Sequence, residues 1–339
     1  MNHKRLGPQT IVLASPPAVL AFASIGGKME SQGPLASYFD ELEQDSFFGE
    51  KTWEKAETAM QKLALSSALD KAGLSASALD YILAGDLLNQ CIGSFLASMH
   101  ANVPYLGQYG ACSTMAQGLA LGGCLVESGA ADRLLAAASS HFCSAERQYR
   151  FPLGYGGQRT PTAQWTVTGS GCCIVGGSGS GVRIEAATIG RVQDLGIKDA
   201  NNMGAAMAPA AIDTLQAHFR DLRRVPQDYD LIVTGDLGAL GKKIVLDQFQ
   251  RVGVDLTPVY DDCGVLIYDP KRQDVHAGGS GCGCGASVLC GYLLDRLEKR
   301  ELRRLLFCAT GALLSPTSSW QGESIPGICH AVAITAEGR

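Results

Sequence analysis

Two hydrophobic patterns alternate along the chain: amphipathic stretches with an apolar residue every three or four positions, and short runs that are apolar throughout. The first pattern is typical of surface helices, and the second of strands buried on both faces of a helix-covered sheet. In the N-terminal half they predict a helix over 53–74, a strand over 79–90, a turn and helix over 110–130 and a strand over 132–141. In the C-terminal half they predict a helix over 203–222, a strand over 229–241, a turn and helix over 278–302 and a strand over 303–316.

The second series repeats the first. Residues 84–87 read AGDL and residues 234–237 read TGDL, while Arg-Leu-Leu occurs at 133–135 and again at 304–306. A repeat of this size predicts an α/β protein made of two similar halves, 1–180 and 181–339, around a pseudo-twofold axis. The Gly/Ser-rich residues 176–181 are the expected boundary between them. Two unrelated α/β units are the alternative.

Cys112 stands in the stretch GACSTM, where a predicted turn enters an apolar helix. Cys282 and Cys284 stand at the equivalent turn of the second half, so both turns are expected to face one central pocket. Because the positive end of a helix favours a thiolate, the sequence predicts a lowered pKa for Cys112. The backbone N–H groups of such turns also suit a carboxylate or an oxyanion. A small residue needed for close packing is the alternative reading.

His141 is the histidine whose position suggests chemistry, because it ends a predicted buried strand on the pocket side. We expect it to line the pocket, with a hydrogen-bonded histidine at a strand end as the alternative. His100 and His218 lie in predicted helices and are expected to be solvated, and His330 to be structural.

The segment after His141 is expected to be a loop whose arginines could bind a planar anion. Its basic residues are Arg147, Arg150 and Arg159, and its aromatic and glycine residues include Tyr149, Tyr155, Gly154, Gly156 and Gly157. Surface ion pairs are the alternative role for each arginine. At the end of the strand before Cys112, Asp86, Asn89 and Gln90 could add polar contacts, and Asp236 is the counterpart of Asp86 in the second half.

The composition narrows the class of protein. A formal net charge of −5 without a long basic run argues against nucleic-acid binding. Pro16 and Pro17 interrupt the N-terminal apolar run, so 10–14 and 18–24 are expected to be two short strands and no cleaved signal peptide is expected. Twelve cysteines without a CxxC pair indicate a reducing compartment and no metal site.

The motifs GACST, ASSH, AERQYRFPLGYGGQ and AGGSGC, with VTGDL and ATGALLSPT, resemble the stage V sporulation protein AD family of spore-forming bacteria, and the resemblance runs from about Gly33 to nearly the end. It implies a thiolase-like fold with layered αβαβα halves and mixed central sheets. It implies a protein of the forespore or spore, peripheral at the inner membrane beside other SpoVA membrane proteins. It implies binding of dipicolinic acid, free or as its calcium chelate, and a homodimer without a cofactor.

The resemblance places the dipicolinate site in the pocket where condensing enzymes bind acyl groups. The expected ligand-binding residues are Cys112, Ser113, His141, Asn89, Asp236, Cys282, Cys284 and Arg147. Working condensing enzymes pair the elbow cysteine with His or Asn from the second half, whereas this chain has Asp236 and Cys282 there. Neither can replace a neutral imidazole or amide as an oxyanion donor at neutral pH. We therefore expect a binding protein, with two alternatives: a condensing enzyme using Cys112 as nucleophile and His141 as base, or a scaffold that binds no dipicolinate.

Overall fold

The computed structural model describes residues 4–149, 159–179 and 181–336. Its strands are β1 (Arg5–Leu6), β2 (Thr10–Val12), β3 (Ala18–Gly26), β4 (Glu41–Leu42), β5 (Tyr81–Gly85), β6 (Tyr105–Gly107), β7 (Arg133–Ser140), β8 (Trp165–Thr166), β9 (Gly169–Gly176), β10 (Val182–Thr188), β11 (Leu231–Thr234), β12 (Tyr260–Asp262), β13 (Gly279–Ser280), β14 (Arg304–Ala312) and β15 (Gly327–Ala336). Its α-helices are α1 (Trp53–Ala72), α2 (Ile92–Met99), α3 (Thr114–Glu127), α4 (Phe142–Tyr149), α5 (Met203–Leu222), α6 (Gly238–Arg251), α7 (Cys263–Leu266), α8 (Cys282–Val288), α9 (Leu294–Glu298) and α10 (Pro316–Trp320).

The two halves of the sheet have the same strand order. The first runs β3-β9-β7-β5-β6 and the second β10-β15-β14-β11-β12. In each half the second strand is antiparallel to both neighbours and the last three strands are parallel to one another. The predicted duplication and the α/β class are confirmed by this topology, while the boundary at residue 180 stays a prediction.

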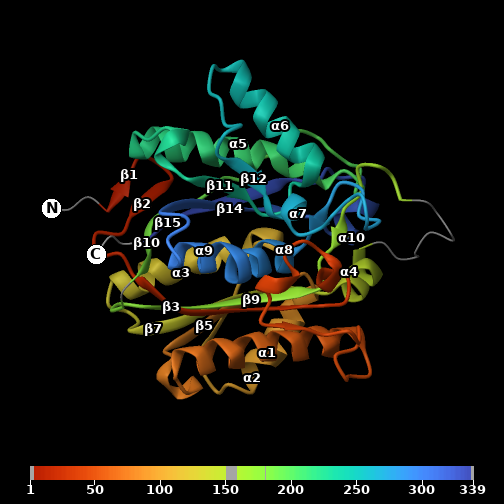
Figure 1. Cartoon of the computed structure of the whole chain (residues 1–339). Helices are drawn as coiled ribbons and strands as arrows, with labels where there is room; N and C mark the ends of the chain where they lie inside the picture. The colour runs from red at the N-terminus through yellow and green to blue at the C-terminus, as the bar shows by residue number, and fades with distance from the viewer. Residues whose placement is uncertain (1–3, 150–158, 180, 337–339) are drawn as a thin grey trace.

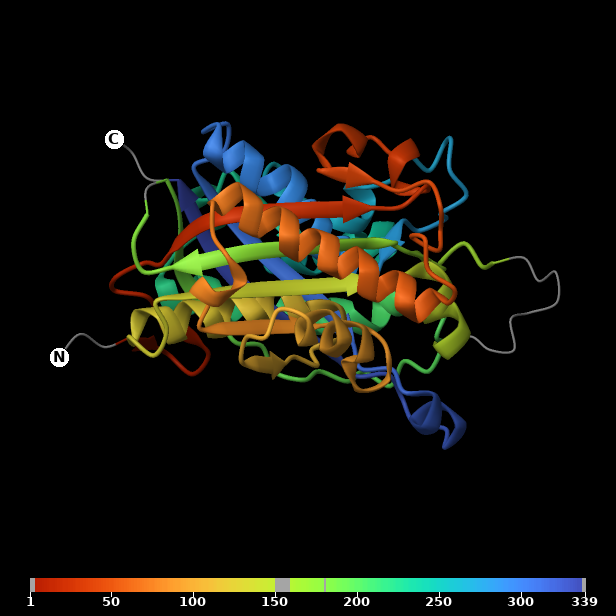
Figure 2. The ribbon, with the colours of Figure 1, turned by 90° about the horizontal axis from the view of Figure 1, so that it is seen from below.

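The halves stack as five layers. Figure 1 shows α5 and α6 above the strands of the second half, α3, α8 and α9 in the middle, then the strands of the first half, and α1 and α2 below. Figure 2, from below, shows α1 crossing β3, β9 and β7. β3 and β10 join the halves through one residue pair, Arg183 with Ala18. The layers place α3 and α8, which begin at the two predicted turns, face to face at the centre.

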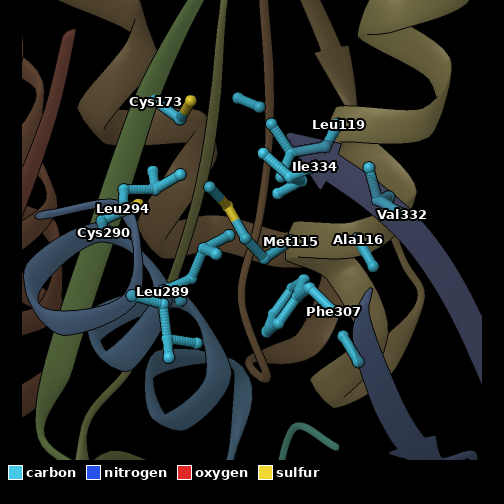
Figure 3. Close-up of a cluster of buried hydrophobic side chains, with 14 of the residues drawn as sticks. Met115, Ala116, Leu119, Cys173, Leu289, Cys290, Leu294, Phe307, Val332 and Ile334 are labelled. Atoms are coloured by element: carbon cyan, nitrogen blue, oxygen red, sulfur yellow. The ribbon is translucent and has the colours of Figure 1, made fainter. Parts of the chain in front are cut away.

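The core between the two sheets is formed by α3, α8 and the strands on either side. Met115 of α3, Leu289 after α8 and Phe307 of β14 are all fully buried, and Figure 3 shows their side chains meeting in one cluster. Burial of one such side chain stabilises a fold by about 1.5–3 kcal/mol. The starts of α3 and α8 are therefore held firmly against the opposite half.

The N-terminal residues form the two expected strands, because 10–12 are β2 and 18–26 are β3, inside the sheet. No helix of the described residues is long and apolar enough to cross a bilayer. One expectation is wrong: the segment after His141 is not a loop throughout, since α4 occupies Phe142–Tyr149. Arg150, Gly154, Tyr155, Gly156 and Gly157 lie outside the described residues.

Candidate functional site

The turn that carries Cys112 is a single helical turn, Ala111–Ser113, leading directly into α3. Ala111 has a φ of 47°, in the left-handed region, and the Ser113 hydroxyl donates a 2.6 Å hydrogen bond to the Gly110 carbonyl. The turn rests on Gly311 of β14: a Cβ at that position would lie 2.6 Å from the Gly110 oxygen. The backbone of the second half therefore fixes the Cys112 turn, and this approach requires a glycine.

The equivalent turn of the second half closes behind Cys112. Gly281 has a φ of 102°, and Cys282 follows as the first residue of α8. The Cys282 thiol is fully buried and donates to the Ala111 carbonyl at 2.9 Å. The Cys112 and Cys282 thiols are also hydrogen-bonded to each other. The structure thus brings the two predicted turns together at one point.

Asp236 lies beneath this contact. Its carboxylate is completely buried and accepts hydrogen bonds from the Gly281 N–H at 2.9 Å, the Thr310 hydroxyl at 2.8 Å and the Cys112 thiol. Burial raises the pKa of Asp236 to about 6, against the lowering effect of these hydrogen bonds. At neutral pH the group is mainly ionised, so a negative charge stands directly behind Cys112.

Cys112 does not have the lowered pKa that its place before a helix predicted. The hydrogen bond that the Cys112 thiol donates to Cys282, burial and the charge of Asp236 together raise the pKa of the Cys112 thiol well above its usual value. Because the thiolate is the nucleophile, a raised pKa means an unreactive sulfur at neutral pH. The helix end is outweighed by neighbours that the fold supplies from the other half.

A pocket opens above Cys112, between the two halves. Its lining is Leu87, Tyr109, Ala111, Cys112, Ala145, Glu146, Tyr149, Thr166, Met203, Met207, Ser280, Ala312 and Leu314. Two tyrosine rings and two methionines give it aromatic and thioether surface, which suits a flat aromatic ligand. Among these described lining residues Glu146 is the only one with a formal charge, and none is basic.

Several predicted site residues lie elsewhere. His141 does not line the pocket; its Nε2–H donates to the Ser46 carbonyl at 2.7 Å, and burial lowers its pKa. Asn89 is exposed and donates its backbone N–H to Gln148. Ser113 is buried in its own turn, and the Cys284 thiol contacts the Gly235 carbonyl in the core. The alternative reading of His141, a hydrogen-bonded histidine at a strand end, describes its contacts.

Arg147 points away from the pocket because it stands on the outer face of α4. It pairs with Glu54 and covers the ring of Trp53. Ala145 and Tyr149, one turn apart on the same helix, reach the pocket together with Glu146. Arg159 covers the ring of Trp165 and pairs with Asp274.

Two other histidines, His100 and His218, differ in their exposure to solvent. His100 is exposed, as expected. His218 is not solvated, because it is completely buried between the Thr188 and Tyr229 hydroxyls. Sequence reasoning missed Tyr109, Met203, Met207 and Ala312 as pocket residues; apolar helix and turn residues carry no signal that separates them from core. No group of three or more His, Cys, Asp or Glu in the described part of the chain could hold a metal ion.

Comparisons with known proteins identify the family and the fold. The chain matches the stage V sporulation protein AD (SpoVAD) family over residues 7–335. Stage V sporulation protein AD of Bacillus subtilis (strain 168) is 45% identical over 335 residues, which is 99% of each chain.

Among solved structures, human mitochondrial 3-ketoacyl-CoA thiolase in complex with CoA aligns with a TM-score of 0.60 at 13% identity, covering 96% of this chain and 99% of the thiolase. 3-Oxoacyl-[acyl-carrier-protein] synthase III from Aquifex aeolicus VF5 aligns with a TM-score of 0.57 at 12% identity, covering 94% and 99%. At such low identity these structures establish a thiolase-like fold and leave the chemistry open.

Proposed function

Because this chain belongs to the stage V sporulation protein AD family, we propose that it binds dipicolinate, pyridine-2,6-dicarboxylate, in the Cys112 pocket during spore formation and catalyses no reaction there. The observation that carries this proposal is an open pocket built on an elbow cysteine whose thiol is held protonated by Cys282 and Asp236. Such a site retains a place for a ligand and lacks an activated nucleophile.

The chemistry of the lining supports an aromatic dicarboxylate. A pyridine ring can lie against Tyr109, Tyr149 and the two methionines, as aromatic and thioether groups prefer. α3 begins at Thr114, two residues after Cys112, and is 14 residues long, so its positive end favours a carboxylate. Thr166 and Ser280 add polar groups at the wall.

The charge of the site favours the calcium chelate over the free dianion. Asp236, whose carboxylate is mainly ionised at neutral pH, stands directly behind Cys112. A free dianion would meet negative charge of the same sign, whereas the chelate of Ca²⁺ with dipicolinate is neutral. Calcium also accepts oxygen ligands of several kinds, so its bound form tolerates carboxylates nearby.

Calorimetric titration tests the proposal. The full-length protein is titrated with dipicolinate in the presence and absence of Ca²⁺, beside the variants Ala312→Phe and Ala130→Phe. Ala312 is half-buried in the pocket wall, so a phenyl ring there fills the site, whereas Ala130 is an exposed turn residue that serves as the matched control. We expect heat from the wild type and from Ala130→Phe, stronger with Ca²⁺, and at least a tenfold loss of affinity in Ala312→Phe. No heat under either condition would refute dipicolinate binding and favour a scaffold.

We also propose a homodimer at the inner forespore membrane, beside other SpoVA membrane proteins. β6 is the last strand of its half of the sheet, and α2 next to it exposes Ile92, Phe95 and Met99 on one face. Leu106 of β6 is 42% exposed and extends this apolar surface. A symmetric dimer would cover the surface with its own copy. Sedimentation of wild type and Phe95→Glu tests this, and equal monomer masses for both would refute it.

A condensing enzyme with Cys112 as acyl nucleophile is the second candidate. The thiolase-like fold and the place of Cys112 in an open pocket favour it. Such an enzyme needs a general base near Cys112. His141 does not meet this need, because it lies outside the pocket lining and its Nε2–H donates to the Ser46 carbonyl. The two functions differ in whether Cys112 acquires an acyl group.

A further inference from the structure

Two carboxyl groups lie buried side by side next to the pocket wall. Glu57 of α1 is 1% exposed, and Asp86, which follows β5, is 0% exposed. Both face Gly93 in α2: a Cβ there would lie 3.2 Å from Asp86 Oδ2 and 3.6 Å from Glu57 Cγ. The proposed function does not use either group.

Neutral donors surround both carboxyl groups. Asp86 accepts the Leu88 N–H at 2.8 Å and both the N–H and hydroxyl of Ser94 at 2.7 Å. Glu57 is bonded to the hydroxyls of Ser139 at 3.2 Å and Ser144 at 2.8 Å. Within the described residues neither carboxyl has an ion-pair partner, and two adjacent buried charges without a cation are strongly unfavourable.

The other titratable groups that face the pair supply no positive charge. They are Cys91 before α2, Tyr105 of β6 and Cys282 of α8. Burial raises the pKa of Cys91 to about 11 and raises the pKa values of Tyr105 and Cys282, so all three are neutral at physiological pH. β7 and α4 present Ser139 and Ser144, which do not titrate.

The proton belongs on Glu57. Asp86 accepts two backbone N–H groups, whose orientation is fixed, and these stabilise its carboxylate. The partners of Glu57 are hydroxyls, which can rotate to accept a hydrogen bond as well as donate one. Burial, together with the charge of Asp86, raises the pKa of Glu57 to about 8.

We propose that Glu57 and Asp86 hold one proton between them, carried by Glu57 beside the ionised Asp86, and that this singly protonated pair holds together the two segments that form one wall of the pocket. These segments are residues 87–94, whose Leu87 lines the pocket, and α4, which contributes Ala145, Glu146 and Tyr149. The pair bonds to both, through Leu88 and Ser94 on one side and Ser144 on the other. Gln148 and Tyr149 of α4 in turn donate to the Leu87 carbonyl.

Glu57 is therefore a positioning residue that touches no ligand, and ligand binding becomes dependent on pH. This consequence rests on the proposed function, whereas the coupling of the wall to the proton does not. A pKa raised on folding means that the protonated carboxyl is favoured in the folded chain, so its contribution is lost as pH rises from about 4.5 to about 8. Above pH 8 two like charges face each other and the wall loosens.

Hydrogen exchange of the full-length protein tests the inference without any ligand. Amide protection of residues 87–94 and of α4, corrected for intrinsic rates, is compared at pH 6 and pH 9 in wild type, Glu57→Gln and Glu30→Gln. Glu30 is the matched control, because its carboxyl is also completely buried with a raised pKa but bonds to Tyr268 and Thr168 instead of the pair.

We expect protection in both segments to fall at least tenfold between pH 6 and pH 9 in wild type and Glu30→Gln, and to change less than threefold in Glu57→Gln. Asp86→Asn, which also removes the second charge, should behave as Glu57→Gln does and replaces it if that variant fails to fold. Unchanged protection in wild type, or the same loss in both neutral variants, would overturn the inference.

A second titration separates this inference from the proposed function. With calcium dipicolinate at pH 6 and pH 9, the affinity of wild type should fall at least fivefold and that of Glu57→Gln should stay constant within twofold. If exchange changes as expected but no ligand heat appears at either pH, the proposed function fails and the shared proton stands. If ligand binds with the same pH dependence in both proteins, the shared proton fails and the binding function stands.

Discussion

Asp86 and Asp236 occupy the same place in the two halves, each directly after the glycine that ends β5 or follows β11, and the structure uses them differently. Asp86 bonds to Leu88 and Ser94 in its own half and lies beside Glu57. Asp236 bonds to Gly281 and Thr310 in its half and also reaches the Cys112 thiol of the other half. One aspartate lies behind a wall of the pocket, and the other lies buried behind Cys112.

The equivalent turns that carry Cys112 and Cys282 also have different surroundings. Cys112 lines the open pocket, whereas Cys282 is fully buried with its thiol given to Ala111. A duplicated fold therefore does not give two equivalent sites. The turn of the second half packs against the turn of the first, where Cys282 and Asp236 favour the protonated form of the Cys112 thiol.

The largest expected effect comes from removing the structural aspartate. Asp86→Ala leaves the Leu88 and Ser94 N–H groups buried without an acceptor, so the free energy of unfolding should fall by about 3 kcal/mol. Urea unfolding followed by circular dichroism measures the loss. Asp86→Asn, which keeps a carbonyl acceptor, should lose less than half as much; equal losses in the two variants would show that the hydrogen bonds at Asp86 do not matter.

A smaller effect is expected where the second half supports the first-half turn. In Gly311→Ala the new Cβ meets the Gly110 carbonyl at 2.6 Å, and this overpacking should cost about 2 kcal/mol of unfolding free energy. Because the turn carries Cys112, ligand affinity should fall as well. Gly285→Ala is the control, since its nearest neighbour lies at 3.4 Å. A Gly311→Ala protein as stable as Gly285→Ala would contradict the close contact between the halves.

Cys282→Ala should raise the reactivity of Cys112 without restoring an enzyme. The hydrogen bond to Cys282 is the largest cause of the raised pKa of Cys112, so its loss should lower that pKa and increase the thiolate fraction. Alkylation by iodoacetamide at pH 8, followed by peptide mass spectrometry, measures the rate at Cys112. Cys284→Ala is the control, because that thiol bonds to Gly235 instead. No acceleration in Cys282→Ala would refute the role given to the second-half turn.

The smallest effect is expected at Arg147, whose ion pair with Glu54 lies on the outer face of α4. Exposed ion pairs contribute about 0–1 kcal/mol, so Arg147→Ala should change the unfolding free energy by less than about 0.5 kcal/mol. Dipicolinate affinity should stay within twofold of wild type by calorimetry. A tenfold loss of affinity would place Arg147 in the site after all.

Much of the fold could be predicted from the sequence, because its signals are local. The continuous apolar runs at 81–85 and 304–312 identify buried strands. The repeated Gly-Asp marks the ends of β5 and β11 and reveals the duplication, which predicts that the turns of Cys112 and Cys282 face each other near Asp236. The helix α4 is not evident from the sequence, because it is eight residues long and adjoins a segment rich in glycine and arginine that predicts a loop. Without the helix, the sequence does not show that Arg147 lies on the opposite face of α4 from Ala145 and Tyr149.

The electrostatic state of Cys112 could not be predicted either. Its place before α3 suggests a lowered pKa, and the opposite shift comes from Cys282 and Asp236, more than 120 positions away in the chain. The pairing of Glu57 with Asp86 is equally hidden, because each residue alone looks like an ordinary helix or strand-end acid. Contacts between different layers of the fold determine the protonation states of these groups, and a single sequence does not reveal such contacts.

Intact-mass spectrometry after incubation with acetyl-CoA and a longer acyl-CoA tests the central claim, that this elbow cysteine binds without catalysing. We expect an unmodified wild-type mass after hours at pH 7.5, with iodoacetamide at pH 9 labelling Cys112 as proof that the sulfur is reachable. A stoichiometric acyl adduct mapped to Cys112 would contradict the account and make the protein a condensing enzyme.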